Sequence, residues 1–395
     1  MPDPARALVF SPPPPPPGGL PGGIAAITAV LMREIGDRPG VIFAAPVRKE
    51  DGGRLGLRRG VASLLRLVRA TARLHRNGSV LFFSSAGFSF WEKCAWSLLV
   101  RMMGRDVAIV MVDGNFPTYF ARLPAPAKWL ARATMRGPRL RIGAQSPAWK
   151  EFYTSIMPDA RIECVTASVD REFFAAHEAN AETDGTLRVL YVGWIIEAKG
   201  LLDLLDAVAI VRSDVARRFV VRLVGPLLDG PERWQREVEL RHLGEVVTFV
   251  GSITQRTALL EEYRAADLFV FPSHFEGFPV ALVEAAAVGL PSIGTAVGGV
   301  PDILDRGRAG IVVQPHAPDQ LAAAIRTMLS DDAQRAVLGI ALAEHARREY
   351  THDACARSYL RLLGYPGDVR SASIAQEAQH GNHSRTLETG TSVDS

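Results

Sequence analysis

Short apolar runs alternate along the chain with longer segments in which apolar residues recur at helical spacing. In the first half, the apolar runs predict strands at 7–10, 41–45, 80–84 and 107–112. In the second half, they predict strands at 188–192, 220–224, 246–250 and 268–271. Strands separated by helices favour parallel sheets. The sequence therefore predicts an α/β protein with two Rossmann-like, doubly wound domains.

The apolar pattern lapses at two places, which we interpret as boundaries. Residues 175–186 are dominated by Ala, Glu, Asn and Thr, and the chain after residue 366 is polar without a hydrophobic period. A chain of 395 residues is also too long for one ordinary domain. We expect a first domain, a second domain, a helix that packs back on the first domain, and a disordered tail. Their expected ranges are 1–175, 176–350, 351–366 and 367–395.

A segment rich in proline and glycine follows the first predicted strand. Six prolines, Gly18-Gly19 and Gly22-Gly23 precede a helix predicted at about 24–35. Because glycines let backbone N–H groups approach a phosphate at a helix N-terminus, Gly22 and Gly23 are candidate phosphate-binding residues. The alternative is a stiff surface loop in which the glycines serve only turn geometry.

Composition favours a cytoplasmic location. Cys94, Cys164 and Cys355 are too far apart for a disulfide framework or a zinc site, and the nine histidines form no ligand cluster in the sequence. The N-terminus lacks the basic start and apolar core of a signal peptide. The longest apolar stretch, 277–300, is interrupted by glycines, prolines and Glu284, so no transmembrane helix is expected.

The net charge of +3 conceals an asymmetry between the two halves. Residues 1–175 carry 24 Lys and Arg against 13 Asp and Glu, whereas residues 176–365 carry 19 against 25. A basic amphipathic helix is predicted around Arg66, Arg69, Arg73 and Arg76, and further basic residues follow at Lys128, Arg132, Arg136, Arg139 and Arg141. This pattern predicts contact with an anionic membrane surface, and the alternative is a solvated helix face. Aromatic residues do not interleave with these basic ones, so nucleic-acid binding is not expected.

The most informative segment runs from Phe271 to Glu284, FPSHFEGFPVALVE. A strand ends at its start, a loop carries Glu276, and a helix begins with Pro279 in its first turn, where a missing N–H costs nothing. The helix N-terminus offers free N–H groups and a favourable dipole to a phosphate. Glu284 lies among Val, Leu and Ala, so its carboxylate needs a partner. Sugar hydroxyls would supply one; the alternatives are a salt bridge for Glu284 and a solvated loop for Glu276.

Two glutamates separated by seven residues on this scaffold resemble the donor-site motif of retaining GT-B glycosyltransferases of the family-4 type, the glycosyl transferases group 1. The resemblance spans roughly residues 188–330. It includes Tyr191 to Gly200, Phe249 to Gly251, Tyr263 to Gly289, Gly298 to Asp302, and Gly310. It implies GT-B architecture, in which two facing Rossmann-like domains enclose an interdomain cleft. It also implies a nucleotide-diphosphate sugar of UDP or GDP type as co-substrate, with no other cofactor and no metal.

The resemblance further implies roles for individual residues. Glu276 would contact the donor sugar, Glu284 the ribose hydroxyls and Lys199 the donor phosphates. Lys199 also follows a strand and opens a helix predicted at 201–211, so its ammonium and the helix N-terminus converge on one anion. The alternative for Lys199 is a surface lysine at a helix start. The remaining donor-site candidates are Gly22, Gly23, Gly193, Gly251, Gly277, Phe278, Pro279 and Val280.

Three departures from the family pattern concern the chemistry. The family usually has an arginine directly after the strand-ending glycine, where this chain has Trp194, which supplies no charged fork to a diphosphate. Asp113 stands where many relatives place a histidine near the reacting sugar. Its carboxylate would accept a proton or orient a hydroxyl, or would serve only the turn before Gly114. Thr166-Ala-Ser168 replaces the family's Pro-Asn-Gly at the interdomain hinge.

We therefore expect a retaining glycosyltransferase that moves a sugar from a nucleotide-diphosphate sugar to a hydroxyl of a glycan or lipid-linked acceptor, in cell-surface polysaccharide or glycolipid biosynthesis. Asp113, Lys199 and Glu276 are the catalytic candidates. We expect the enzyme in the cytoplasm, peripheral on the inner face of the membrane. The alternative is a noncatalytic GT-B-fold subunit of a glycan assembly complex, favoured by Trp194 and Asp113. A nicotinamide-dependent dehydrogenase is disfavoured because the chain lacks the Gly-any-Gly-any-any-Gly fingerprint.

Overall fold

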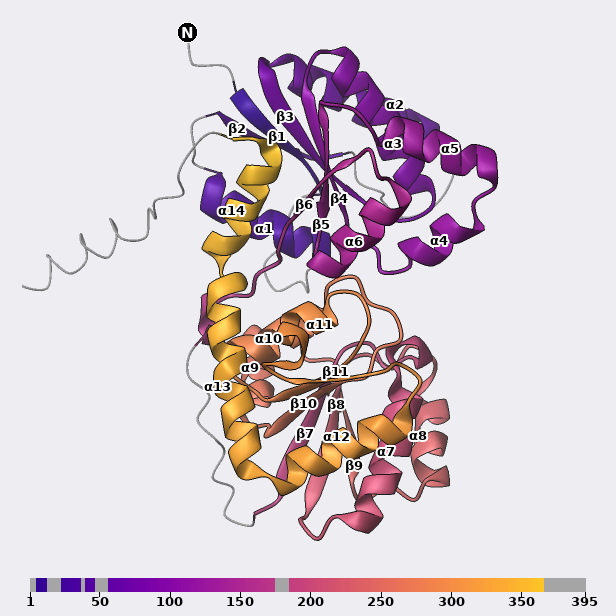
Figure 1. Cartoon of the computed structure of the whole chain (residues 1–395), viewed down its shortest axis with the longest axis vertical. Helices are drawn as coiled ribbons and strands as arrows, with labels where there is room; N and C mark the ends of the chain where they lie inside the picture. The colour runs from indigo at the N-terminus through magenta and orange to yellow at the C-terminus, as the bar shows by residue number, and fades with distance from the viewer. Residues whose placement is uncertain (1–4, 13–22, 37–39, 47–55, 175–184, 366–395) are drawn as a thin grey trace, which may run out of the picture.

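The computed structural model describes residues 5–12, 23–36, 40–46, 56–174 and 185–365. In this part of the chain, two six-stranded parallel sheets form two α/β domains, which lie one above the other along the long axis of the molecule (Figure 1). Helices cover both faces of each sheet, and most strand residues are buried, as a parallel sheet requires. The predicted fold class is confirmed: the protein has two Rossmann-like domains.

The first domain has the strand order β2-β1-β3-β4-β5-β6. Its strands are β1 (Ala5–Phe10), β2 (Val41–Ala44), β3 (Leu74–Ser84), β4 (Asp106–Met111), β5 (Leu140–Ala144) and β6 (Arg161–Cys164). Its helices are α1 (Gly23–Ile35), α2 (Gly56–Ala72), α3 (Phe88–Met102), α4 (Phe116–Arg122), α5 (Ala125–Thr134) and α6 (Pro147–Ile156). Because side chains alternate along a strand, Leu8 and Phe10 enter one core, whereas Ala7 and Val9 enter the core on the opposite face.

The second domain has the strand order β12-β11-β10-β7-β8-β9. Its strands are β7 (Leu187–Val192), β8 (Phe219–Val224), β9 (Val247–Gly251), β10 (Leu268–Phe271), β11 (Ser292–Thr295) and β12 (Ile311–Val313). Its helices are α7 (Leu201–Asp214), α8 (Pro231–Leu240), α9 (Arg256–Arg264), α10 (Val280–Val288), α11 (Val300–Ile303), α12 (Pro318–Ser330) and α13 (Asp332–Glu349). Short 3-10 turns are η1 (Arg171–Phe174), η2 (Glu197–Lys199) and η3 (Asp305–Gly307). The order reverses between β7 and β10, and ligands of such sheets bind beyond the carboxyl ends of the strands at this switch point.

The last described helix, α14 (His352–Leu363), returns the chain to the first domain (Figure 1). Cys355, Tyr359 and Leu362 are buried in one core together with residues of α1, β1 and β3. The Ser79 hydroxyl donates a hydrogen bond of 2.6 Å to the carbonyl oxygen of Leu363. The C-terminal helix therefore completes the core of the first domain, and α13 and α14 tie the two domains together.

All eight strands predicted from the apolar runs are present, and four short ones were missed. These are β5, β6, β11 and β12, whose sequences LRIGA, RIEC, SIGT and IVV are too short or too polar to stand out. Their strand conformation depends on pairing with a neighbour in the sheet. No helix in the described ranges is both long and apolar enough to cross a bilayer. Residues 175–184 of the expected boundary and the expected tail, 367–395, lie outside the described residues.

Candidate functional site

Lys199 and Glu276 meet at the switch point of the second sheet. Lys199 ends η2, which follows β7, and Glu276 lies in the loop between β10 and α10. The Lys199 Nζ lies 2.6 Å from Oε2 of Glu276, and the two side chains are 21% and 15% exposed. The strand order thus joins two residues that are 77 positions apart in the sequence. An ammonium and a carboxylate are presented together at the edge where α/β sheets bind ligands.

The backbone of the Glu276 loop is held by the segments after two neighbouring strands. The His274 N–H donates a hydrogen bond of 3.1 Å to the Ala198 carbonyl, and the Gly299 N–H donates one of 3.1 Å to the Gly277 carbonyl. Gly298 has a φ of +50°, and a Cβ at this position would lie 2.0 Å from the Glu276 carbonyl oxygen. Only glycine permits this approach. The glycine pair after β11 therefore fixes the course of the Glu276 loop.

The same loop also contacts the first domain. The Trp149 indole N–H, on α6, donates a buried hydrogen bond of 2.7 Å to the Gly277 carbonyl. A Cβ on Gly114, which follows β4, would lie 2.5 Å from the Glu276 carbonyl carbon. A cavity of about 330 Å³ lies between the domains, lined by residues of both. These include Gln145 and Ser146 of the first domain and Phe278 and Asp302 of the second. The Glu276 loop is thus fixed by both domains.

Glu284 lies in α10 and is only 4% exposed. Its Oε1 accepts a hydrogen bond of 2.8 Å from Arg256 Nη1, and its Oε2 accepts one of 2.9 Å from the Tyr263 hydroxyl. Burial raises the pKa of this carboxyl above its usual value, and Arg256 and Tyr263 oppose the shift. The salt bridge weighed as an alternative from the sequence is therefore present. Each carboxylate oxygen can accept two hydrogen bonds, so Glu284 can still accept hydrogen bonds from ribose hydroxyls. That contact stays a prediction.

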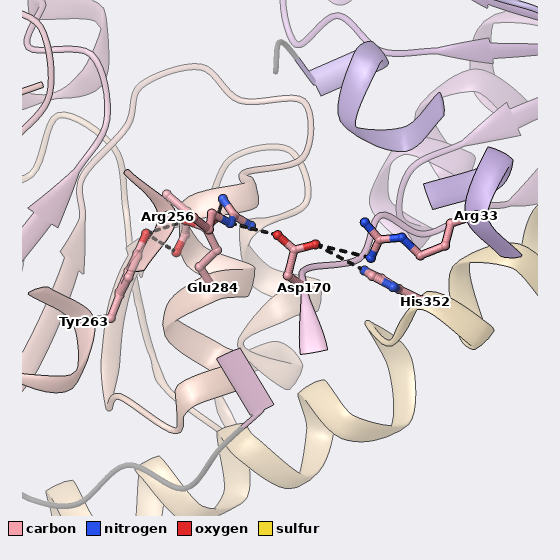
Figure 2. Close-up of polar contacts among 7 residues, drawn as sticks. Arg33, Asp170, Arg256, Tyr263, Glu284 and His352 are labelled. Carbon is pink, nitrogen blue, oxygen red and sulfur yellow. Dashed lines mark hydrogen bonds and ion pairs between the residues drawn. The ribbon is translucent and has the colours of Figure 1, made fainter. Parts of the chain in front are cut away.

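Arg256 connects Glu284 to the segment in which the chain crosses between the domains (Figure 2). Its Nε donates a hydrogen bond of 2.9 Å to Oδ2 of Asp170, which lies between β6 and η1. The other Asp170 oxygen lies 3.9 Å from Nη1 of Arg33 on α1 and 3.7 Å from Nε2 of His352 on α14. Neither Arg256 nor Asp170 was a candidate from the sequence, because partners so far apart in the chain leave no local signal.

Asp113 follows β4, and both of its carboxylate oxygens accept hydrogen bonds from the backbone. Oδ1 accepts from the Asn115 N–H at 2.8 Å, and Oδ2 accepts from the Ala86 N–H at 2.9 Å. These contacts fit the alternative in which Asp113 serves only the turn before Gly114. They also connect the segments that follow β3 and β4. A catalytic role for Asp113 stays a prediction.

The predicted glycines and the start of α10 lie as follows. Gly193 follows β7, and its N–H donates a hydrogen bond to the Val224 carbonyl at the end of β8. Gly251 ends β9, and its carbonyl accepts a hydrogen bond from the N–H of Gly225, the residue after β8. Gly22 lies outside the described residues, and Gly23 is the first residue of α1. Pro279 caps α10 rather than lying in its first turn, so Val280 is the first helical residue.

Phe278 and Trp194 present their side chains differently. The Phe278 side chain is 9% exposed and packs in the core of the second domain. Its ring lies edge-on to that of Tyr350, with 5.7 Å between the ring centroids. A ligand would therefore meet mainly the Phe278 backbone. The Trp194 side chain, which occupies the position of the family's usual arginine, is 59% exposed.

The expected basic stripe is shorter than predicted. Arg66 and Arg69 are exposed on α2, which ends at Ala72, whereas Arg73 follows the helix and Arg76 lies in β3. The four arginines therefore do not share one helix face, because the chain leaves the helix and enters β3 at Leu74. Two apolar side chains of the same helix, Val61 and Leu65, are about half exposed, at 50% and 51%.

Of the other predicted basic residues, Arg141 is engaged within the first domain. It lies 4.0 Å from Asp106 and 3.7 Å from Glu163. Arg132 donates a hydrogen bond to the Ile156 carbonyl at 2.8 Å, and Lys128 donates one to the Ala121 carbonyl at 2.8 Å.

A group of imidazoles and a carboxylate, which spacing in the sequence did not predict, lies beside the Lys199–Glu276 pair. Nε2 of His274 lies 2.9 Å from Oδ2 of Asp203, and the ring of His316 lies 3.7 Å from the ring of His274, centroid to centroid. One side-chain ligand atom from each residue lies within 4.8 Å of the other two. The sequence predicted no cluster of histidine ligands, but the fold brings two histidines and Asp203 together.

The second half of the chain is similar to known glycosyltransferases. Residues 172–344 match the family model described as glycosyl transferases group 1. D-inositol 3-phosphate glycosyltransferase from Mycobacterium marinum is 34% identical over 216 residues, which are 52% of this chain and 46% of that protein. The protein of the same name from Nocardiopsis dassonvillei is 34% identical over 264 residues, 62% of this chain and 59% of that protein. The chain spans about half the length of the curated relatives it matches.

Solved structures are similar over nearly the whole chain. Sucrose-phosphate synthase from Thermosynechococcus elongatus has a TM-score of 0.70 at 19% identity, covering 96% of this chain and 100% of that one. Anabaena Alr3699/HepE in complex with UDP has a TM-score of 0.68 at 16% identity, covering 91% and 100%. At this identity, the likeness shows the fold, which is the GT-B arrangement of two Rossmann-like domains.

Proposed function

We propose that this protein transfers a sugar from a nucleotide-diphosphate sugar to a hydroxyl of a glycan or lipid-linked acceptor, and the match of residues 172–344 to the family model of glycosyl transferases group 1 supports the proposal. The observation that carries the proposal is the Lys199–Glu276 pair. The pair stands at the switch point of the second sheet, and Glu276 lies in a loop that both domains fix. A donor bound there reaches an acceptor presented by the first domain.

In this proposal the residues of the pair have different tasks. The Lys199 ammonium and the N-terminus of α7 stabilise the negative charge that develops on the leaving diphosphate. Glu276 accepts hydrogen bonds from hydroxyls of the donor sugar. The ion pair of 2.6 Å holds both side chains in place before the donor arrives, so little reorganisation is needed at the moment of reaction. No metal enters this proposal, and retention of configuration rests on the family resemblance.

Glu276→Gln tests the site against a matched control. The control, Glu262→Gln, changes a glutamate that is similarly exposed, at 17%, and paired with Arg222 on other elements. Hydrogen bonds to a charged acceptor contribute roughly 1.5–3 kcal/mol, so Glu276→Gln should weaken the binding of nucleotide sugars by roughly 10- to 100-fold. UDP or GDP alone should lose less affinity, because Glu276 contacts the sugar and affects the diphosphate only through its ion pair with Lys199. Calorimetric titration with UDP, GDP, ADP and their glucose conjugates measures both affinities. Equal weakening in both variants would refute the assignment.

Turnover separates the enzyme from the alternative, a noncatalytic subunit of a glycan assembly complex. Trp194 and the backbone-bound carboxylate of Asp113 favour that alternative. Release of the nucleotide diphosphate should be measured with the best-binding donor and a panel of acceptors. The panel includes D-inositol 3-phosphate, which the name of the curated relatives mentions. Nucleotide-sugar binding without product from any acceptor would favour the noncatalytic subunit.

A lipid-linked acceptor also requires a place at the membrane, and we place the enzyme as a peripheral protein on the inner face. The outer surface of the first domain combines basic and apolar side chains. Exposed apolar residues lie on α2, α3 and α5, and include Val61, Leu65, Met102 at 82% exposure and Trp129 at 68%. Arg66 and Arg69 stand on the same α2. Such a surface fits anionic lipid by charge and by burial of apolar area.

Vesicle sedimentation tests this placement. The protein should bind vesicles that contain anionic phospholipid more tightly than neutral ones, and Arg66→Glu with Arg69→Glu should abolish the difference. Arg306→Glu with Arg308→Glu, on the second domain, is the control of equal charge change and should bind as the unmodified protein does. Binding that survives reversal of Arg66 and Arg69 would contradict the placement.

A further inference from the structure

Asp203, His274 and His316 come from three segments that surround the carboxyl ends of the second sheet. Asp203 lies in the first turn of α7, His274 in the loop after β10, and His316 three residues after β12. One ligand atom from each lies within 4.8 Å of the other two. We propose that these three residues bind a divalent transition-metal ion of the Zn²⁺ class.

Two of the ligands are already held in place. The His274 and Asp203 side chains are 9% and 17% exposed, and the imidazole Nε2–H donates to the carboxylate at 2.9 Å. The backbone N–H of His274 donates to the Ala198 carbonyl, and a Cβ on Gly200 would lie 3.3 Å from Nε2 of His274. This nitrogen therefore faces the start of α7, where Asp203 stands. A metal ion at this point replaces the shared proton, as metal binding to imidazole commonly does.

The third ligand is adjustable. His316 is exposed and has a φ of +57°, and its ring lies against that of His274 with an interplanar angle of 36°. In a tetrahedral Zn²⁺ site, with metal-to-ligand distances near 2.0–2.1 Å, ligand atoms lie about 3.3 Å apart. Atoms now within 4.8 Å reach that separation by rotation of an exposed side chain.

The donor set selects the kind of ion. Two imidazoles and one carboxylate suit Zn²⁺, Co²⁺ or Ni²⁺, whereas Mg²⁺ and Ca²⁺ prefer oxygen ligands alone. Three protein ligands leave a coordination position for water or another small ligand. The site does not include Lys199 or Glu276, but two of its ligands lie on the same segments. Asp203 follows Lys199 by four residues, and His274 precedes Glu276 by two.

The competing explanation is purely structural. His274 would stay hydrogen-bonded to Asp203, and His316 would stack on it without binding a metal ion. The two explanations differ in their response to His316→Ala, because His316 makes no hydrogen bond to the other two residues among the contacts of the described chain. An exposed alanine at this position should leave folding intact.

The test is titration of the metal-free full chain with ZnCl₂, followed by calorimetry and by the change in melting temperature. CoCl₂ is used in parallel because its visible absorption reports nitrogen and oxygen ligands directly. The matched control is His242→Ala, since His242 is also exposed and has a φ of +55°. This control measures any loss caused by removing a histidine from a left-handed surface position.

We expect one tight site per chain in the unmodified protein and in His242→Ala. His316→Ala and Asp203→Asn should each weaken it by at least about tenfold and abolish the cobalt absorption of this site. The rise in melting temperature on adding Zn²⁺ should disappear in the same two variants. Equal binding by the unmodified protein and His316→Ala, or no binding by the unmodified protein, would overturn the proposal. Equal binding would place any bound metal elsewhere, for example at histidines outside the described residues.

Discussion

Replacing Arg256 with methionine tests how the buried Glu284 is stabilised. The substitution keeps much of the side-chain volume and removes the partner of Oε1, while Glu284 is only 4% exposed. Breaking a buried ion pair on one side costs about 3–5 kcal/mol. Because the Arg256 side chain is 36% exposed, water replaces part of the lost contact, and we expect the lower end, about 3 kcal/mol. For a domain of this size, that loss lowers the melting temperature by roughly 6–12 °C.

The loss should depend on pH in a defined direction. Burial raises the folded-state pKa of Glu284, so the folded protein binds more protons than the unfolded chain above the unfolded pKa of about 4.3. Stability associated with this group therefore falls as pH rises from the unfolded to the folded pKa. Without Arg256 the folded pKa rises further, and the window becomes wider. The difference between unmodified and variant protein should be small near the unfolded pKa and grow towards neutral pH.

Differential scanning calorimetry over this pH range measures the effect, with Arg222→Met as the matched control. The Arg222 side chain is 32% exposed and donates two hydrogen bonds to Glu262. The side chain of Glu262 is 17% exposed, whereas that of Glu284 is 5% exposed. We expect the control to lose about 1 kcal/mol or less, without growth towards neutral pH. Equal losses in the two variants, or a loss in Arg256→Met that does not change with pH, would refute the reasoning.

Two further outcomes follow from buried groups. Trp149→Phe removes the indole N–H that donates to Gly277 between the domains, and it should cost about 1–3 kcal/mol of unfolding free energy; an unchanged melting temperature would contradict this. Iodoacetamide at about pH 8 should modify Cys164, which is exposed, before the two buried thiols. Burial raises the pKa of Cys94 to about 11 and that of Cys355 to about 12, so few thiolates form there, and equal labelling by mass spectrometry would contradict the structure.

Much of the fold could be predicted from the sequence, because its signals are local. Apolar runs such as 107–112 and 268–271 reveal strands that are buried on both faces, whatever their neighbours. Short strands such as Ser292–Thr295 escaped, since their conformation comes from pairing rather than from their own composition. The helix over Arg73 and Arg76 was predicted too long, because the basic pattern continues past Leu74, where strand β3 begins.

The sequence by itself indicated Lys199 at a helix start and Glu276 in a loop before a helix as candidates for a donor site, which stays a prediction. Only the tertiary structure decided the partners. Strand order joins His274 to Asp203 across 71 positions, and the packing of α9 on α10 joins Arg256 to Glu284 across 28. The contact between the domains joins Trp149 to Gly277 across 128. Periodicity reports the conformation of neighbouring residues in the chain. Contacts between distant residues depend on which strands pair and how the domains meet, and the spacing of residues carries no record of either.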